Sequence, residues 1–459
     1  MKYLLKNGTV VSGTGVKKLD VLVEDEKIAK VEEGLSNPEA KVIDVTGKLL
    51  FPGFIDGHTH FDLEVAGTVT ADDFETGTRA AILGGTTLVI DFASQDKGGH
   101  TLKEGLEKWH KKADGKCSCD YSFHMSIVEW NEETKKEIQD MIDEGITSFK
   151  LYMTYPAMIV DDEDLYKIIK ALDEKGCFAG VHCENAGVID ALIQEAKEQG
   201  RFGPENHPLV RPDTMEAEAV HRLLVIAKEA DAPVMVVHLT NQKAYEEILR
   251  ARENGQTVFA ETCPQYLLLD DSVYSKPDFE GAKYVCAPPI RKKEDQDCLW
   301  KALSNGDIQT VATDQCSFTL AQKALGKEDF TKIPGGLPGV QTRGTLLYTY
   351  GVGTGKISVE KMCQLLCENP AKLYGVYPDK GVIREGSDAD IVVFDPEKEN
   401  VISARTHAYN TDNNPYEGFK LHGDIDKVFL RGNLAVEDGK LVREKLGTYI
   451  KRGKRQSLD

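Results

Sequence analysis

Hydrophobic and polar positions alternate in one way at the two ends of the chain and in another way between them. LDVLVEDEKIAKVEE (19–33), DADIVVFDP (388–396) and KVFLRGNLAVEDGKLV (427–442) place apolar residues at every second position over part of their length. A period of two is typical of a half-buried β-strand. We therefore expect a small β-sandwich domain built from both termini, residues 1–50 with 378–445.

The middle of the chain, residues 51–377, repeats a different unit. A short run of β-branched and apolar residues is followed each time by a segment of helical period, as in SFKLYMT and then DEDLYKIIKALDEKG. Such alternation implies a parallel sheet, and eight units fit a closed (β/α)8 TIM-like barrel. The predicted strands are LLFPGFIDGH (49–58), TTLVIDFA (86–93), YSFHMSIV (121–128), SFKLYMT (148–154), FAGVHCEN (178–185), PVMVVHLT (233–240), TVFAETCP (257–264) and QTVATDQ (309–315).

Reactive side chains cluster where these strands end. Barrels of this kind carry their chemistry at the carboxyl ends of the strands. The residues in question are His58 and His60 on strand one, Lys150 on strand four, His182 on strand five, His238 on strand six and Asp314 on strand eight. A single histidine in an apolar strand is more often a hydrogen-bonded core residue than a ligand. The joint pattern, at one end of one barrel, is hard to explain as packing and predicts a metal site.

The HxH pair FPGFIDGHTHFD is the strongest part of that pattern. Alternate side chains of a strand point to the same face, so His58 and His60 are expected to project together. Lys150 has two interpretations. A buried ammonium is costly unless it is paired or neutralised, either by a neighbouring carboxylate or by carbamylation with carbon dioxide. The position of Lys150 in the sequence does not decide between these two interpretations.

Composition and charge exclude several classes of protein. The 459 residues carry a formal net charge of −19, which argues against nucleic-acid or acidic-membrane binding. No apolar run reaches the length of a membrane span, and MKYLLKNGTV reads as a strand and not as a signal peptide. Ten cysteines without a framework predict reduced thiols and a cytoplasmic location. KRGKR, in the C-terminal tail 446–459, is read as a solvated basic cluster.

Taken together, the motifs resemble the cyclic amidohydrolases, and dihydropyrimidinase and D-hydantoinase most of all. The resemblance covers nearly the whole chain and is carried by FPGFIDGHTHFD, GITSFKLYMTY, VHCEN, VVHLT, ETCPQYL, YVCAPPIR and VATDQC. It implies a centre of two Zn²⁺ (other divalent ions also fit such ligands) and a homotetramer. By resemblance, His58 and His60 hold one ion together with Asp314, His182 and His238 hold the other, carbamylated Lys150 (N6-carboxylysine) bridges both, and Tyr155 hydrogen-bonds the developing oxyanion.

The expected activity is hydrolysis of the cyclic amide bond of 5,6-dihydropyrimidines or 5-substituted hydantoins to N-carbamoyl amino acids. A metal-bridging hydroxide would attack the carbonyl carbon. Asp314 would carry the proton from the attacking water to the ring nitrogen. The reaction needs a small cyclic ureide and no nucleotide, flavin or nicotinamide, and nothing in the chain resembles a phosphate loop.

Two alternatives are weighed against this one, namely a dihydroorotase or allantoinase, and a non-catalytic scaffold. Dihydroorotases usually carry an arginine in HxHxR for the substrate carboxylate, and here that position is Asp62. Allantoinase is harder to exclude. A non-catalytic scaffold of the same fold, like the collapsin-response proteins, would have lost metal ligands, whereas every ligand position that can be matched is filled.

Three departures from the family pattern bear on substrate range. Asp314 is followed by Gln315 where a histidine is usual, the usual SPP is Ala287-Pro288-Pro289, and IPGGLPGVQTR (333–343) lacks the asparagine of its relatives. Contacts from the backbone at Ala287 should tolerate the lost hydroxyl. We expect Leu63 and Phe92, with Tyr155, to contact the substrate, and ordinary loop packing is the alternative for each.

Overall fold

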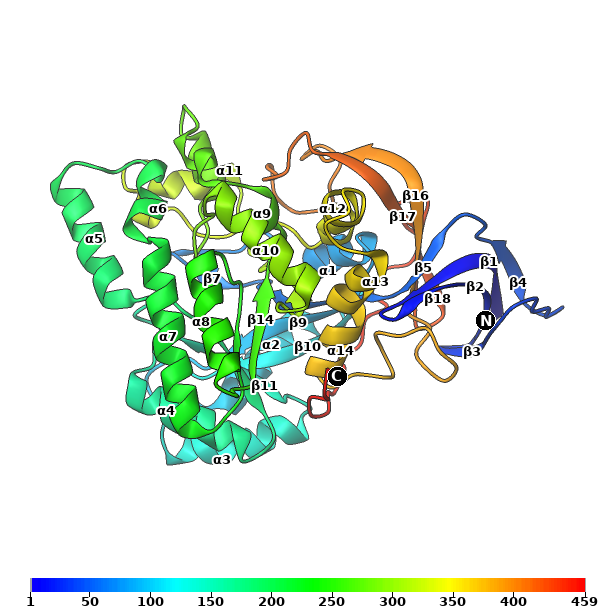
Figure 1. Cartoon of the computed structure of the whole chain (residues 1–459), viewed down its shortest axis with the longest axis horizontal. Coiled ribbons are helices and arrows are strands. Elements are labelled where there is room, and N and C mark those ends of the chain that lie inside the picture. Colours follow the sequence, from blue (N-terminus) through cyan, green and yellow to red (C-terminus); the bar gives the residue numbers. More distant parts are fainter. Residues whose placement is uncertain (1, 459) are drawn as a thin grey trace.

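A parallel sheet of eight strands curls into a barrel at the centre of the molecule, in a computed structural model that describes residues 2–458 (Figure 1). All eight predicted strands are present, and the predicted (β/α)8 fold is confirmed. Their order around the barrel follows the chain: β6 (Phe54–Thr59), β9 (Thr86–Ser94), β10 (Asp120–Ser126), β11 (Ser148–Tyr152), β12 (Phe178–His182), β13 (Val234–Val236), β14 (Val258–Thr262) and β15 (Thr310–Val311). The strands read as continuous apolar runs because both of their faces are buried.

The barrel closes between its last and first strands through side chains as well as backbone. A β-bridge joins Thr59 to Gln315, and Thr313 Oγ1 donates to Asp56 Oδ2 at 2.7 Å. The buried guanidinium of Arg343 donates to the carbonyl oxygens of Ile55 and Val311. These contacts connect β6 to β15 and close the barrel. Because the strands are parallel, their carboxyl ends all lie at the same opening.

Helices on the outside return the chain from each strand to the next. The long ones are α1 (Phe74–Leu83), α2 (Leu102–Ala113), α3 (Glu132–Asp143), α4 (Asp162–Asp173), α5 (Ala186–Glu198), α7 (Asp213–Ala230), α8 (Gln242–Glu253) and α10 (Lys293–Asn305). Shorter elements are β7 (Glu64–Val65), β8 (Thr68–Val69), α6 (His207–Val210), α9 (Pro264–Leu268), α11 (Leu320–Lys323), α12 (Arg343–Leu347), α13 (Val359–Cys363) and α14 (Asn369–Leu373). Side-chain caps such as Asn131 on α3 and Asn241 on α8 begin the helices next to the strand ends.

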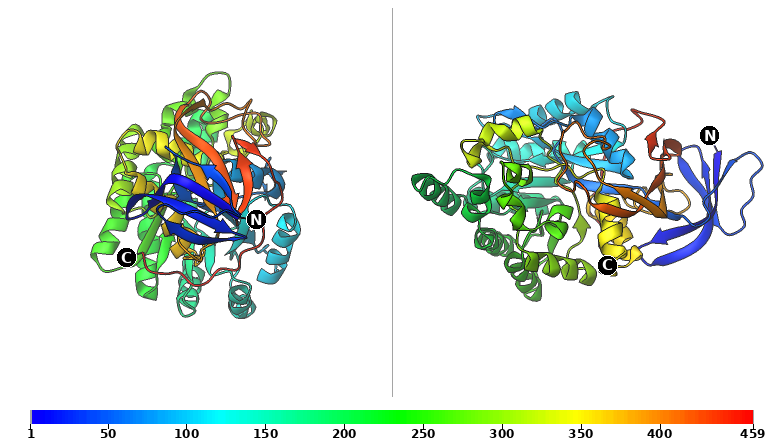
Figure 2. Two further views of the ribbon diagram at one scale, coloured as in Figure 1. Left: turned by 90° about the vertical axis from the view of Figure 1, so that its right-hand side faces the viewer. Right: turned by 90° about the horizontal axis from the view of Figure 1, so that it is seen from above.

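A second sheet lies to one side of the barrel and combines both ends of the chain (Figures 1 and 2). Its strands are β1 (Lys2–Ser12), β2 (Gly15–Glu24), β3 (Lys27–Glu32), β4 (Lys41–Asp44), β5 (Leu49–Pro52), β16 (Ile391–Val401), β17 (Lys420–Leu430), β18 (Asn433–Glu437) and β19 (Lys440–Leu441). The division of the chain into 1–50 with 378–445, 51–377 and 446–459 stays a prediction.

One predicted strand divides between the two sheets. We expected 49–58 to be the first barrel strand, but β5 pairs with β1 and β16 in the terminal sheet, and only β6 belongs to the barrel. Gly53 separates them. Its N–H donates to the carbonyl oxygen of Asp390, the residue before β16, at 2.8 Å. A Cβ at Gly53 would lie 2.0 Å from Thr87 Oγ1, so only glycine permits this close passage.

A buried charge cluster, the junction cluster of Lys380, Asp120, Asp388, Asp390 and Arg431, connects the barrel to the terminal sheet. Lys380 Nζ lies 2.8 Å from Asp120 Oδ2, 2.6 Å from Asp390 Oδ2 and 3.1 Å from Asp388 Oδ2. Arg431 pairs with the other oxygen of Asp120. Each buried charge here has an opposite charge in contact.

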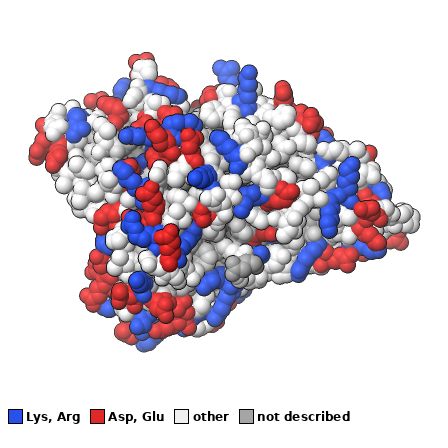
Figure 3. Space-filling view, in the orientation of Figure 1, with Lys and Arg blue, Asp and Glu red and all other residues white. Residues whose placement is uncertain are grey.

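The C-terminal segment crosses the amino-terminal end of the barrel. Arg452 is 4% exposed and donates to Ser122 Oγ, Ser148 Oγ and the carbonyl oxygen of Phe123. The prediction that KRGKR is solvated is therefore wrong for Arg452. Within residues 2–458, no helix is long and apolar enough to cross a membrane. The face in Figure 3 intersperses lysine and arginine with aspartate and glutamate.

Candidate metal centre

The predicted ligand side chains come together at the carboxyl ends of the barrel strands. His58 lies in β6, with His60 just beyond its end, Lys150 lies in β11, and His182 is the last residue of β12. His238 and Asp314 follow β13 and β15 by two and three residues. The alternation expected for an HxH strand is observed, since the rings of His58 and His60 are 5.2 Å apart.

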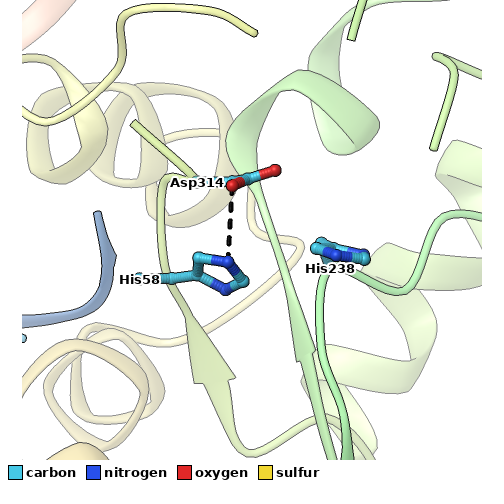
Figure 4. A group of neighbouring side chains, drawn as sticks. All are labelled: His58, His238 and Asp314. Atoms are coloured by element: carbon cyan, nitrogen blue, oxygen red, sulfur yellow. Dashed lines mark ion pairs between the residues drawn. The ribbon is translucent and has the colours of Figure 1, made fainter. Parts of the chain in front are cut away.

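Donor atoms from three strands converge closely enough for one cation. One donor atom each of His58, His238 and Asp314 lies within 4.8 Å of the others (Figure 4). Asp314 Oδ1 is 3.3 Å from His58 Nε2 and 3.1 Å from His60 Nε2. The ring of His182 is 4.5 Å from that of His238, which itself is 5.5 Å from the ring of His58. The four imidazoles therefore form one continuous group around Asp314.

Two imidazole nitrogens in this group are buried and lack a hydrogen-bond partner among the described residues. They are Nε2 of His58 and Nδ1 of His238. A buried polar atom without a partner costs free energy, so it calls for an unseen ligand. Imidazole nitrogen is a good ligand for a divalent transition metal, and the residues present fit such an ion.

Buried carboxylates orient the ligand rings from behind. Glu261 Oε1, on β14, lies 2.6 Å from His58 Nδ1, so that Nε2 faces Asp314. Glu184 Oε2 lies 2.7 Å from His182 Nε2, which leaves Nδ1 free. Carboxylate partners of this kind fix the tautomer and direction of metal-binding histidines. Burial raises the pKa of Glu261 to about 8, and a cation at His58 would favour its carboxylate form.

Arg211 connects Glu184 to Tyr155. Its Nη1 donates to Glu184 Oε2 at 2.7 Å, and its guanidinium lies 5.8 Å from the centre of the Tyr155 ring. Burial alone would raise the pKa of Glu184, but Arg211 and His182 hold it below its usual range. The Tyr155 ring packs 5.1 Å from that of His182, and burial raises the pKa of its hydroxyl well above the ordinary value. Tyr155 therefore offers a protonated phenol beside the imidazoles.

Lys150 is buried without a carboxylate partner. Its Nζ lies 5.2 Å from the ring centres of Phe92 and Tyr152, and across residues 2–458 it forms no ion pair or hydrogen bond. Burial lowers its pKa to about 8. The salt bridge that was one explanation for a buried lysine is therefore not formed, and neutralisation remains the physical route to a stable side chain.

Electrostatics in the site favour neutral imidazoles and an ionised Asp314. Burial, reinforced by the charge of Lys150, holds the pKa of His58 well below its ordinary value; burial does the same for His238 and lowers the pKa of His182. Burial opposes ionisation of Asp314, but its close contacts with the imidazoles of His58 and His60 outweigh burial and lower its pKa. Neutral imidazole and carboxylate are the forms that bind a cation.

Three of the predicted site residues adopt left-handed backbone conformations. The φ angles are 68° at Tyr155, 41° at His238 and 53° at Asp314. Residues with a side chain seldom adopt positive φ, and such strain is concentrated at functional sites. The barrel frame holds these three in place at the opening.

The predicted substrate contacts occupy different positions relative to this group. Phe92 is buried under it, with its ring 4.6 Å from that of His58 and 4.9 Å from that of His60. Leu63 is partly buried beyond the end of β6, and Ala287 precedes a cis peptide bond to Pro288. Contact of these residues with substrate stays a prediction.

Gln315, the departure next to Asp314, is buried and organises the segment 333–343. Its side-chain oxygen accepts the N–H groups of Gly339 and Val340, and its amide nitrogen lies 3.3 Å from Asp72 Oδ2. Its backbone oxygen accepts the N–H of His60 at 2.8 Å. Gln315 therefore connects the HxH strand to the segment in which relatives place an asparagine.

Three residues of the site were not assigned from sequence, namely Glu184, Glu261 and Arg211. A weak signal existed for two of them. Glu261 interrupts the apolar run TVFAETCP, and Glu184 follows His182 by two residues, and buried carboxylates in such runs require partners. Arg211 lies in a loop before α7 and carries no such signal.

Comparison with known proteins agrees with the geometry of the site. Residues 49–435 match the Amidohydrolase family. The D-hydantoinase of Geobacillus stearothermophilus is 46% identical over 100% of this chain and 98% of that protein, and the D-hydantoinase of Streptomyces coelicolor is 44% identical over 100% and 99%. The crystal structure of dihydropyrimidinase from Brevibacillus agri superposes with a TM-score of 0.98 at 44% identity, covering 100% of both chains. The chain therefore belongs to the amidohydrolase family and, within it, to the group of the D-hydantoinases and dihydropyrimidinases.

Proposed function

We propose that this protein is a metal-dependent hydrolase that opens the ring of 5-substituted hydantoins and 5,6-dihydropyrimidines to give N-carbamoyl amino acids. Two observations carry the proposal: one donor atom each of His58, His238 and Asp314 lies within 4.8 Å of the others, and a buried nitrogen of each histidine makes no hydrogen bond to a described residue. Full-length similarity to D-hydantoinases and to a dihydropyrimidinase supports the substrate class.

The residues present would hold two divalent ions, for which zinc is our proposal. His58, His60 and Asp314 would hold one, His182 and His238 the other, and Lys150 carbamylated by carbon dioxide would bridge them. The buried, unpaired Nζ of Lys150 supports carbamylation, because the product is an anion among cations. When bound, the ions polarise a carbonyl group and lower the pKa of water.

Each remaining step is assigned to a side chain of this protein. Asp314 is ionised and takes a proton from the attacking water as the water oxygen bonds to the ring carbonyl carbon. The protonated phenol of Tyr155 donates to the carbonyl oxygen as negative charge develops there. Asp314 then returns the proton to the ring nitrogen, and the C–N bond breaks.

Two backbone segments are proposed to bind the polar edge of the ring. The N–H and C=O of Ala287 and the N–H of Gly335 make no hydrogen bond to any described residue. The neighbouring backbone carbonyls, in contrast, accept hydrogen bonds from protein donors. A Cβ built on Gly335 would lie 4.0 Å from Ala287 N, so the two positions are adjacent. An amide edge of the substrate could satisfy these groups. Leu63 and Phe92 are proposed to shape the space around the ring.

The test is a ring-opening assay with zinc-loaded protein on hydantoin, dihydrouracil, allantoin and dihydroorotate. We expect turnover of the first two and none of the last two. The result that would overturn the proposal is turnover of allantoin or dihydroorotate alone. A protein that is silent on all four compounds but binds two ions would have a real site for another substrate, whereas silence without bound metal would favour the scaffold alternative. The homotetramer and the cytoplasmic location remain predictions, and sedimentation of the purified protein tests the first.

A further inference from the structure

Lys323 is a second buried lysine near the opening of the barrel, and its charge also has no carboxylate partner. It ends α11, is 2% exposed, and lies 5.5 Å from the centre of the Phe318 ring. Its Nζ donates instead to three backbone carbonyls: 2.9 Å to Val285 O, 2.8 Å to Pro334 O and 2.9 Å to Gly336 O. Three acceptors match the three donors of an ammonium group.

The three carbonyls belong to two chain segments that are far apart in sequence. Val285 lies two residues before Ala287, and Pro334 and Gly336 flank Gly335 on both sides. The segments also touch directly, since the N–H of Gly336 donates to Val285 O at 2.9 Å. Lys323 therefore lies at the point where the loop after α9 meets the segment after α11.

Neighbouring groups hold the same segments but leave Ala287 free. His207 Nε2 lies 2.7 Å from Cys286 O, and Tyr266 donates to Pro288 O at 2.8 Å. Among described residues, the N–H and C=O of Ala287 have no partner. Gly336 has a φ of 148°, and a Cβ there would lie 2.2 Å from Cys316 O, so its backbone direction depends on glycine. The anchors surround the unpartnered backbone groups without using them.

Burying the ammonium of Lys323 costs free energy, and its hydrogen bonds to the backbone offset part of that cost. Burial lowers the pKa of Lys323 to about 8, and no carboxylate offsets that effect. An apolar side chain would fill the same space beside Phe318 without the cost of burying an ammonium, but would leave the carbonyls of Pro334 and Gly336 without donors. The buried lysine therefore costs desolvation energy, but it fixes the geometry of the two loops.

We infer that Lys323 is a positioning residue for substrate, which joins the two backbone segments that bind the ring and sets the spacing between Ala287 and Gly335. The inference rests on the proposed function for the identity of the ligand, but the joining of the segments stands on the hydrogen bonds alone. Its loss should let the segments separate and weaken binding of the ring, while the metal ligands keep their places.

The test compares Lys323→Met with wild type and with Lys327→Met, an exposed lysine four residues further on. In zinc-loaded protein we expect KM for hydantoin or dihydrouracil to rise on the order of ten-fold or more in Lys323→Met, because small displacements of positioning groups have large effects. Bound metal per subunit should stay at the wild-type value. Lys323→Gln, which keeps donors but not the charge, should fall between, and it replaces Lys323→Met if that variant does not fold.

Hydrogen exchange of peptides covering 284–290 and 331–338 provides a measurement that is independent of turnover. We expect faster exchange in both peptides for Lys323→Met, and wild-type exchange for Lys327→Met. If wild type opens none of the rings, the proposed function fails while exchange still decides the role of Lys323. Unchanged exchange, or an unchanged KM in an active enzyme, overturns the inference, as does a KM effect fully explained by loss of metal.

Discussion

Two buried clusters of charged and titratable groups lie in this molecule, and they are built in opposite ways. In the junction cluster, Lys380 contacts three carboxylates and Arg431 neutralises one of them again. In the metal centre, Lys150 has no carboxylate partner, and nitrogens of His58 and His238 have no hydrogen-bond partner among the described residues. Burial alone therefore does not distinguish a functional cluster from a structural one.

The difference lies in whether the protein itself satisfies each group. A satisfied cluster can stabilise the junction of barrel and terminal sheet and needs nothing more. An unsatisfied cluster is unfavourable until a ligand binds, and it is the arrangement expected of a site that takes up ions. The comparison predicts that substitutions in the metal centre change activity and metal content, whereas those in the junction cluster change the free energy of unfolding.

The largest effect is expected from Lys150→Ala, which should lose bound metal and activity together. Removing the bridging group leaves the two ions without a shared anionic ligand, so turnover should fall on the order of a thousand-fold or more. Metal analysis and the ring-opening assay check this. Addition of short carboxylates should restore part of both. Full activity of the variant without them would contradict a bridging role.

Asp314→Asn should reduce kcat on the order of a thousand-fold, because the amide can neither accept nor return the proton. Steady-state kinetics at saturating substrate and zinc measure the effect. Retention of most of the wild-type rate would remove Asp314 as the proton carrier.

Lys380→Met should act on stability and leave metal content unchanged. Removing one partner of a buried ion cluster leaves uncompensated carboxylates and costs about 3–5 kcal/mol. Urea denaturation measures the free energy of unfolding, with exposed Lys327→Met as a control. A variant as stable as wild type, or one that loses zinc, would break the distinction between the two clusters.

Glu261→Gln should weaken metal binding on the order of 10- to 100-fold through the orientation of His58. Its amide oxygen can still accept a hydrogen bond from His58 Nδ1, but it carries no negative charge and holds the ring less strongly. Competition with a chelator measures the affinity. Wild-type affinity would show that His58 keeps its direction without the buried carboxylate.

The smallest expected effect is the pH dependence of the junction cluster. Burial would raise the pKa of Asp388, but Lys380 and Lys27 outweigh it and lower the pKa below 3.8. The stabilisation from this depressed pKa is fully present above about 4 and is lost as the pH falls through the lowered value. The stability difference between wild type and Lys380→Met should therefore shrink below about pH 4, as denaturation at several pH values would measure. A constant difference would assign the loss in the variant to packing.

Sequence was sufficient for the barrel and for placing the side chains proposed as metal ligands at the ends of its strands. Parallel strands buried on both faces appear as apolar runs, and ligands at strand ends appear as polar residues that interrupt those runs. The boundary between β5 and β6 was missed because the apolar run 49–55 continues across it, and only the different partners of the two strands divide it. Arg452 was misjudged because a basic pentapeptide has the composition of a solvated tail.

By itself, the sequence determined the fold class and the family and located the histidines proposed as ligands, because these depend on local period and on residue types at fixed places in a repeating unit. Only the tertiary structure decided which groups are satisfied. Glu261 orients His58 across about two hundred residues of chain, and Lys323 joins segments that precede and follow it. Whether a buried charge meets an opposite charge, a carbonyl or nothing depends on distant parts of the chain, and that is the distinction between the junction cluster and the metal centre.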